Sequence, residues 1–375
     1  MTLTLLFAFI LIALTFEFIN GFHDTANSIA TVVATKVLTP TKAIMLAASM
    51  ELVGALSGTA VAKTISTGIV DTNLVQMGPD VLICALVGGI LWNLLTWWFG
   101  LPSSSSHALI GGLCGAALSR AFGDWHVLIW SLPADPWWQG KGLLWKIVIP
   151  MVTSPLIGFT LGFTLMGVLL AVISTMNAQG GWLRRITRPR WINAVFGKAQ
   201  LFSSAYMGFA HGLNDAQKTM GLITLGIMTA ASSGVLDNLP QIFDFMRPAP
   251  DSHGEIATWT KIVCAIVMAL GTATGGWRII KTLGHKLVKL HPIHGFAAET
   301  ASATVLSLAA HFGMPVSTTH SISTAIMGVG TAKSPKALKW NVVERIVWAW
   351  LLTLPATALM GFLLVRLAMG MGWIH

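Results

Sequence analysis

The heptapeptide LPSSSSH at residues 101–107 returns in altered form as MPVSTTH at residues 314–320. In both copies an apolar stretch comes before the proline, and a run of mostly small residues follows the histidine. Ser and Thr are favoured helix N-caps and proline suits the first helical turn, so each copy predicts the beginning of a helix. Free backbone N–H groups and the positive end of the helix dipole meet at such a point and favour an anion.

Three further matches occur in the same order along the chain, which indicates an internal duplication. The most informative one pairs GFHDTAN at residues 21–27 with GLNDAQK at residues 212–218 and places Asp24 over Asp215. The second pairs TK at 41–42 and the later KTI at 63–65 with TK at 260–261 and KTL at 281–283, and the third pairs TSP at 153–155 with TLP at 353–355.

The chain is rich in apolar residues and poor in charge. Of its 375 residues, 54% are hydrophobic and 10% are charged, against roughly a quarter charged in an ordinary soluble domain. Several apolar stretches approach or exceed the roughly 20 residues that cross a bilayer, where helices satisfy every backbone group internally. The sequence therefore predicts an all-α polytopic membrane protein. The stretches are residues 3–19, 42–62, 81–99, 147–173, 199–230, 260–277, 296–312 and 346–370.

The basic residues lie in short connections and not on one helical face, so the net charge of +9 indicates membrane topology and no nucleic-acid partner. We expect a first repeat over residues 1–175, a basic cytoplasmic linker over 176–198 and a second repeat over 199–375. The other basic connections can share the linker's side only if residues 81–121 and 294–331 form re-entrant hairpins. The two repeats are then inverted copies, as in transporters that work by alternating access.

This topology places both termini outside and divides the charged connections between the two sides. An acidic loop falls outside, but three basic residues fall there too, against the positive-inside tendency. The acidic residues are Asp237, Asp244, Asp251 and Glu255, and the basic exceptions are Arg120, Lys141 and Lys146. The basic residues expected inside are Lys36, Lys42, Arg184, Arg185, Arg188, Arg190, Lys198, Arg278, Lys281, Lys286, Lys289, Lys333, Lys336, Lys339 and Arg345.

Ionisable residues recur in pairs inside the predicted membrane helices, where each costs at least a few kcal/mol. In the first helix, the pair Asn20-Gly21 predicts a break just before His23, Asp24 and Asn27. Asp24 and Asn27 share one helical face, as do Asp215 and Lys218. Carboxylate and amide oxygens suit Na⁺, whereas a carboxylate beside a histidine can hold a proton. A purely structural pairing of these groups is the alternative.

We expect phosphate to bind at the two hairpin tips, whose hydroxyls supply short donors without net charge. The alternative is a solvated serine-rich turn. The candidates for phosphate binding are Ser103, Ser104, Ser105, Ser106, Ser317, Thr318, Thr319, Gln217 and Lys218. The candidates for a coupling ion or proton are Asp24, Asn27, Asp215, Asn214, His23, Glu51 and Glu299, with Na⁺ at Asp24, Asn27 and Asp215. For His107 and His320, binding an anion, accepting a proton and a structural role all stay open.

The segments at residues 20–27 and 211–218, together with the two Ser/Thr-His heptapeptides, resemble the inorganic phosphate transporter (Pit) family over nearly the whole chain. The resemblance implies phosphate symport, with roles for the two aspartates, Asn27, the hairpin tips, Glu51 and Glu299. Sodium-coupled relatives tend to have asparagine where this chain has His23. The sequence Phe-His-Asp at residues 22–24 resembles the bacterial proton-coupled branch of the family. This resemblance implies H⁺ as the coupling ion and a plasma membrane location. It also implies that phosphate can be carried as a metal-phosphate complex.

Three other functions compete with phosphate symport. A carrier of another oxyanion such as sulfate fits the same motifs. An intramembrane hydrolase would use a serine with His107 and Asp24, but it needs a single asymmetric nucleophile, which a duplicated motif does not favour. A channel needs a continuous polar pore lining, which the paired carboxylates do not predict. We therefore expect no catalytic residues and no resident cofactor, and the sequence leaves a homo-oligomer open.

Overall fold

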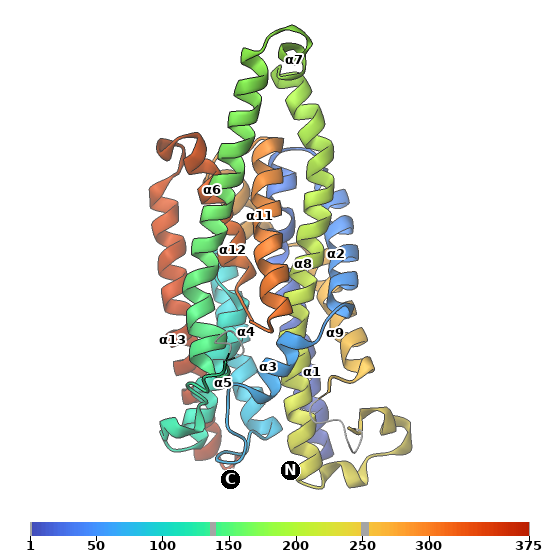
Figure 1. Cartoon of the computed structure of the whole chain (residues 1–375). Helices are drawn as coiled ribbons and strands as arrows, with labels where there is room; N and C mark the ends of the chain where they lie inside the picture. Colours follow the sequence, from blue (N-terminus) through green and yellow to red (C-terminus); the bar gives the residue numbers. More distant parts are fainter. Residues whose placement is uncertain (1, 136–139, 249–254, 375) are drawn as a thin grey trace.

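The computed structural model describes residues 2–135, 140–248 and 255–374, and in these ranges it contains helices and no β-strand (Figure 1). The prediction of an all-α fold is confirmed. The N-terminal part contains α1 (Leu3–Ala34), α2 (Pro40–Leu56), α3 (Ala60–Thr67), α4 (Pro79–Phe99), α5 (Ser105–Arg120) and α6 (Ile149–Ala178). The C-terminal part contains α7 (Gly181–Ile186), α8 (Pro189–Ser232), α9 (Thr258–Thr274), α10 (Trp277–Lys281), α11 (Pro292–His311), α12 (Thr318–Lys333) and α13 (Trp340–Gly370).

Short turns complete these elements. Single π-helical turns, η3 (Leu144–Val148) and η6 (Thr282–Lys286), lead into α6 and follow α10. The 3₁₀ turns are η1 (Trp125–Val127), η4 (Val235–Asn238), η5 (Gln241–Met246) and η7 (Pro335–Ala337). Four helical segments of the described chain are individually long and apolar enough to cross a membrane, namely α1, α4, η3 with α6, and α13. Two bent pairs, α2 with α3 and α9 with the continuous segment of α10 and η6, raise the number to six if each pair counts as one span.

The helix breaks do not lie where the sequence predicts one. The expected break at Asn20-Gly21 is wrong, because α1 runs without interruption from Leu3 to Ala34. Gly21 instead allows close packing, since a Cβ atom there would lie 2.3 Å from the carbonyl oxygen of Met268 in α9. The chain bends between α2 and α3, by 66°, and after α9, by 59°.

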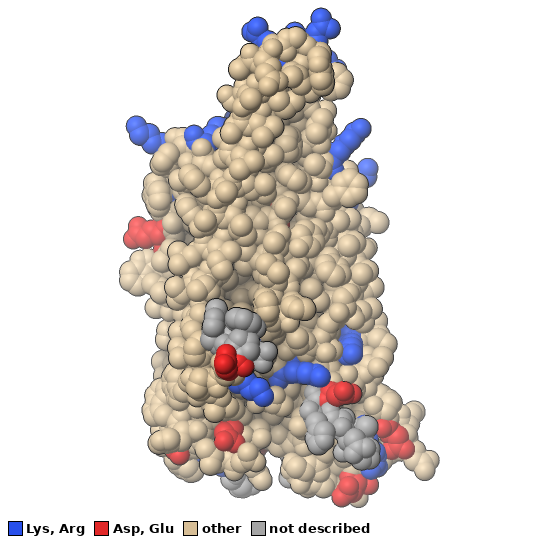
Figure 2. All heavy atoms as spheres, viewed as in Figure 1, with Lys and Arg blue, Asp and Glu red and all other residues tan. Residues whose placement is uncertain are grey.

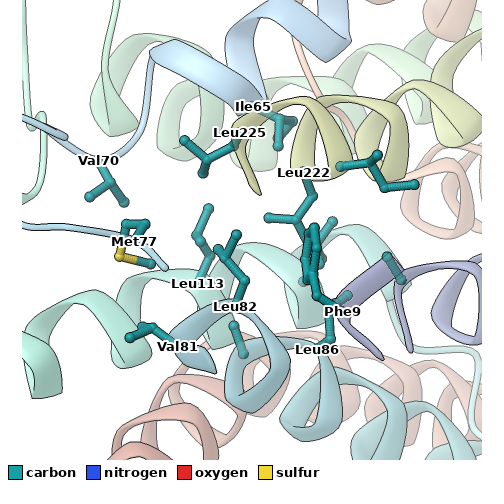
Figure 3. Packing of buried hydrophobic residues seen from close by; sticks show 14 of the residues in the cluster. Phe9, Ile65, Val70, Met77, Val81, Leu82, Leu86, Leu113, Leu222 and Leu225 are labelled. Carbon is teal, nitrogen blue, oxygen red and sulfur yellow. The ribbon is translucent and has the colours of Figure 1, made fainter. Parts of the chain in front are cut away.

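Two hydrophobic clusters occupy opposite ends of the molecule. One gathers the N-terminal part of α1, including Phe9, with α4, α5 and the C-terminal part of α8 (Figure 3). The other gathers the C-terminal part of α1, including Ile29, with α11, α12 and the N-terminal part of α8. Between the two clusters, α1 and α8 carry buried polar residues, which include Asp24 and Asp215. The fold therefore contains a polar layer between two apolar layers.

Helices at matching places in the two repeats run in opposite directions. α1 passes from the first cluster to the second, and α8 passes from the second to the first. Both termini lie at one end of the molecule and α7 at the other (Figure 1). Lys and Arg gather around the α7 end, and most of the visible Asp and Glu lie toward the other end, where further Lys and Arg also lie (Figure 2). Of the acidic loop, Asp251 lies outside the described residues.

The helical hairpins form at the predicted places. α4 packs on α5 and α11 packs on α12, close to the bounds expected at residues 81–121 and 294–331. The second helix of each hairpin then packs along the last helix of the other repeat, so that α5 lies on α13 and α12 lies on α6. The expected linker is largely helical, because α6 continues to Ala178 and α8 begins at Pro189.

Glycines allow these helix pairs to approach closely, as is common where small residues line membrane helix contacts. A Cβ atom on Gly328 of α12 would lie 2.1 Å from the carbonyl oxygen of Phe159 in α6. Nothing lies within 4 Å of the same position on Gly167, which is also in α6.

The two glycines therefore form a matched test of this packing. Gly328→Ala forces α12 away from α6, and we expect it to lower the free energy of unfolding by about 1–3 kcal/mol, measured in detergent. Gly167→Ala should leave stability unchanged or raise it by up to about 1 kcal/mol, because alanine favours the helix. Equal stabilities of the two variants would contradict the close packing of α12 on α6.

Candidate functional site

The two repeated heptapeptides place helix beginnings inside the polar layer. The side chain of Ser104 caps α5 by accepting from the backbone N–H of His107 at 3.1 Å, and Ser317 caps α12 in the same way at His320, at 3.2 Å. The prolines lie two residues before the caps and not in the first turns. The first N–H groups of both helices have no intrahelical acceptor, so two positive helix ends face this layer.

Each aspartate binds the hairpin tip of its own repeat. Ser105 donates to Oδ2 of Asp24 at 2.5 Å, and Thr318 donates to Oδ2 of Asp215 at 3.1 Å. The exposed fraction is 2% for Asp24 and 0% for Asp215. Because Ser105 and Thr318 occupy matching positions in the two heptapeptides, the sequence duplication corresponds to a duplicated contact.

The residue one helical turn later binds the tip of the other repeat. Asn27 donates through Nδ2 to the hydroxyls of Thr319 at 2.9 Å and of Thr318 at 3.1 Å. Lys218, at the matching position, donates to the hydroxyl of Ser106 and forms an ion pair with Asp215 at 2.5 Å.

The two tips also touch directly. Ser106 donates to the carbonyl oxygen of Val316 at 3.5 Å, and Lys218 donates to the same oxygen at 3.1 Å. Asp24 lies within reach of both tips, since the hydroxyl of Thr319 is 3.5 Å from its Oδ1. The structure thus brings α1, α8 and both tips together at one buried place.

Two histidines bind the aspartates, and the predictions included only one of them. Nδ1 of His23 lies 2.7 Å from Oδ1 of Asp24, and its Nε2 lies 3.2 Å from the hydroxyl of Thr96. His211 lies between two carboxylates, with Nδ1 2.7 Å from Oε1 of Glu51 and Nε2 3.2 Å from Oδ2 of Asp215. Its position one helical turn before Asp215 was the sequence signal that could have identified it.

The glutamates connect helices beside the central group. Glu51 of α2 also accepts from Ser28 of α1 at 2.9 Å and from Thr272 of α9 at 2.6 Å. Glu299 accepts from Thr31 of α1 at 2.5 Å and from Gln200 and Ser203 of α8 at 3.0 and 2.5 Å. Both glutamates are fully buried. Glu299 therefore lies apart from the aspartates, whereas Glu51 reaches Asp215 through His211.

The other predicted residues lie around the tips, and among the next three only Ser103 contacts the group, with its hydroxyl 3.4 Å from Nε2 of His23. Ser103 donates to Thr96 at 2.8 Å, and Asn214 donates to the carbonyl oxygen of Met314 at 3.5 Å. Gln217 accepts from the backbone N–H of Val61 at 2.8 Å, at the beginning of α3. A phosphate-binding role for Gln217 stays a prediction.

The two hairpin histidines lie against each other behind the tips. The ring centroids of His107 and His320 are 4.8 Å apart in an edge-to-face arrangement, and His320 also lies 4.1 Å from the ring of Trp350. Within the described part of the chain, neither ring nitrogen of His320 has a hydrogen-bond partner. These contacts favour a packing role for both rings, among the three roles considered.

The group contains oxygen and nitrogen atoms that fit a cation. Ligand atoms of Asp24, His211 and Asp215 lie within 4.8 Å of one another. The side-chain oxygen of Asn27 is buried and has no donor among the described residues. A carboxylate with a carbonyl oxygen suits Na⁺ or another hard cation, and a carboxylate with an imidazole suits a proton or a divalent metal.

Comparisons with known proteins agree on one family. The profile of a family described as "Phosphate transporter family" matches residues 20–361. A protein from Bacillus subtilis named "Probable low-affinity inorganic phosphate transporter" is 40% identical over 352 residues, covering 94% of this chain and 93% of the relative. A protein of the same name from Rhizobium meliloti is 41% identical, covering 96% and 95%.

One solved structure has a similar fold. Its title is "The sodium-dependent phosphate transporter", and the comparison gives a TM-score of 0.78 with 98% of this chain and 99% of that chain covered. The sequences are 24% identical, so this likeness concerns the fold.

The ion pair between Lys218 and Asp215 can be tested by stability. Lys218→Met leaves a buried carboxylate without its fixed cation, and we expect a loss of about 3–5 kcal/mol in the free energy of unfolding. The double change Lys218→Met with Asp215→Asn removes both charges and should recover most of that loss. A single variant as stable as the unaltered protein in detergent would contradict the pairing.

Proposed function

The chain belongs to the phosphate transporter family, and we propose that it moves inorganic phosphate across the bacterial plasma membrane together with a proton. It is a multi-pass membrane protein and not an enzyme. In our proposal the basic linker faces the cytoplasm and both termini face outward.

The main observation in support of the substrate site is that the N-termini of α5 and α12 lie close together. Donors from both repeats meet there, namely the tip hydroxyls, the backbone N–H groups of α5 and α12, and the ammonium of Lys218. Phosphate offers acceptor oxygens in several directions, so it can bind both tips at once. Alternate opening of the two tips would then expose the ion to one side at a time.

The unequal partners of the two aspartates support a coupling site at Asp24. Asp215 has a permanent cation in Lys218 at 2.5 Å. At the matching position beside Asp24 stands the neutral Asn27, and the nearest basic group is His23, at 2.7 Å, which is charged only when protonated. One aspartate is therefore neutralised by the protein itself, and the other needs an ion from outside.

Charge repulsion explains why phosphate and this ion move together. Two like unit charges about 4 Å apart repel by about 4 kcal/mol at an effective dielectric constant of about 20. Phosphate beside an ionised, unneutralised Asp24 meets such a cost, which a proton shared by His23 and Asp24 removes. Phosphate binding therefore favours proton binding, and proton binding favours phosphate binding.

Sodium and divalent metals are the competing coupling ions. The free oxygen of Asn27 near Asp24 supports Na⁺, and the set of Asp24, His211 and Asp215 supports a divalent metal carried as a complex with phosphate. Among these coupling ions we favour the proton, because His23 binds Asp24 directly. A homo-oligomer remains compatible with the proposal, which places one complete site in each chain.

Asp24 and Asp215 provide the mutational test. We expect Asp24→Asn and Asp215→Asn each to abolish gradient-driven phosphate uptake, because an amide at position 24 cannot take up the coupling proton and an amide at position 215 leaves the charge of Lys218 unbalanced. Asp237→Asn is the matched control, since this aspartate is exposed in η4 and lies away from the site. Normal accumulation of labelled phosphate by either site variant would refute the coupling role.

Separate ion gradients across liposomes identify the coupling ion and the substrate. With the purified protein reconstituted, an inward proton gradient should drive uptake of labelled phosphate, and a sodium gradient at equal pH should not. Uptake driven by sodium alone, or only in the presence of a divalent metal, would assign the site to that cation instead. Competition by sulfate as strong as that by phosphate would indicate a general oxyanion carrier.

A further inference from the structure

A basic cavity opens at the end of the molecule that holds the termini. Its volume is about 610 Å³, and it lies between α3, the segment before α6 and the end of α11. Three lysines and a histidine contribute to its wall, namely Lys63, Lys141, Lys146 and His311. Two of these lysines, Lys141 and Lys146, are basic residues that the topology places outside against the positive-inside tendency.

The exposed lysines give this cavity a positive charge. Lys63 and Lys141 are exposed, and among the described residues neither forms an ion pair with Asp or Glu. Figure 2 shows Lys or Arg atoms on the lower part of the visible face, where α3 lies in Figure 1. Several cations around one hollow raise the local concentration of anions and speed their arrival.

One non-helical segment separates this cavity from the tips. Residues 312–316 lead directly into α12, and side chains bind the carbonyl oxygens of four of these five residues. The cavity side contributes Lys146, bound to Phe312 at 2.9 Å, and Thr64, bound to Gly313 at 2.7 Å. The buried side contributes Asn214, bound to Met314, and Lys218, bound to Val316. The cavity and the buried site thus share this segment as a common wall.

The matching place at the opposite end of the molecule has different contacts. Thr282, the counterpart of Thr64 in the repeat, donates to the carbonyl oxygen of Gly100 at 2.9 Å, so the contact with the hairpin is duplicated. There, however, Arg278 donates to the carbonyl oxygen of Trp98 at 2.6 Å and lies over the rings of Trp97 and Trp98. At this matching place the basic side chain therefore contacts the chain itself, whereas Lys63 and Lys141 are exposed in the cavity.

We propose that this cavity is a capture site for phosphate, in which Lys63 and Lys141 hold the anion before residues 312–316 move and admit it to the buried site. The inference rests on the proposed function and adds an entry site to it. Lys146 positions the separating segment through Phe312. The two exposed lysines bind the anion by charge and leave the coupling at Asp24 unchanged.

Neutral substitutions of the two exposed lysines test the capture site. In reconstituted liposomes under a proton gradient, the double variant Lys63→Gln with Lys141→Gln should raise the KM for phosphate about tenfold at low ionic strength, with kcat nearly unchanged. The difference should shrink to about twofold at a salt concentration where the Debye length is only a few Å. Lys336→Gln, an exposed lysine at the linker end, is the matched control and should leave KM unchanged.

A second measurement changes the charge at position 141 chemically, after the protein has folded, and follows the KM for phosphate. Lys141→Cys should regain a low KM after reaction with a cationic thiol reagent and show a still higher KM after reaction with an anionic one. The unaltered chain treated in the same way is the control, since Cys114 and Cys264 are buried and Cys84 is half-buried.

The outcomes separate the two proposals. An unchanged KM in the double variant, or an equal rise in the Lys336→Gln control, would overturn the capture site while the transport function stands. Absence of phosphate uptake by the unaltered protein would overturn the proposed function, and phosphate would then fail as the ligand of the cavity as well.

Discussion

The hydrogen bond between a buried aspartate and the hydroxyl at a hairpin tip, made once in each repeat, is the contact on which the site depends. An ionised carboxylate in an apolar environment costs several kcal/mol unless donors compensate it. Ser105 and Thr318 supply such donors at 2.5 and 3.1 Å, and the positive ends of α5 and α12 lie at the same place. Movement of either tip would remove a donor from a carboxylate, and in our proposal Lys218 compensates this loss at Asp215 and the coupling proton compensates it at Asp24.

The two repeats share a geometry and differ in charge, and this difference supplies a physical basis for coupled transport. Both aspartates bind their own tip, and Asn27 and Lys218 both bind the opposite tip. Lys218 gives the second repeat a permanent positive charge, whereas His23 gives the first repeat a charge that depends on protonation. A transporter built from two identical repeats would lack this division between a fixed cation and an exchangeable one.

Much of the site could be predicted from the sequence because duplication and apolar patterning are local signals. The two helix beginnings with Ser/Thr caps, the hairpins and the pairing of Asp24 with Asp215 follow from repeated motifs and their order. Long-range contacts leave no such signal. The expected break at Asn20-Gly21 was wrong because Gly21 allows close packing against α9, a helix more than 200 residues away in the sequence. His211 was missed because its second partner, Glu51, lies 160 residues away.

A high-resolution cryo-EM structure of the protein in lipid with phosphate bound tests the central claim most directly. The account predicts one phosphate ion in contact with both hairpin tips, through donors of residues 104–106 and 317–319, with Lys218 beside it and Asp24 and Asp215 within the same buried layer. Phosphate bound to only one tip, or two tips separated by lipid or by other helices, would contradict it.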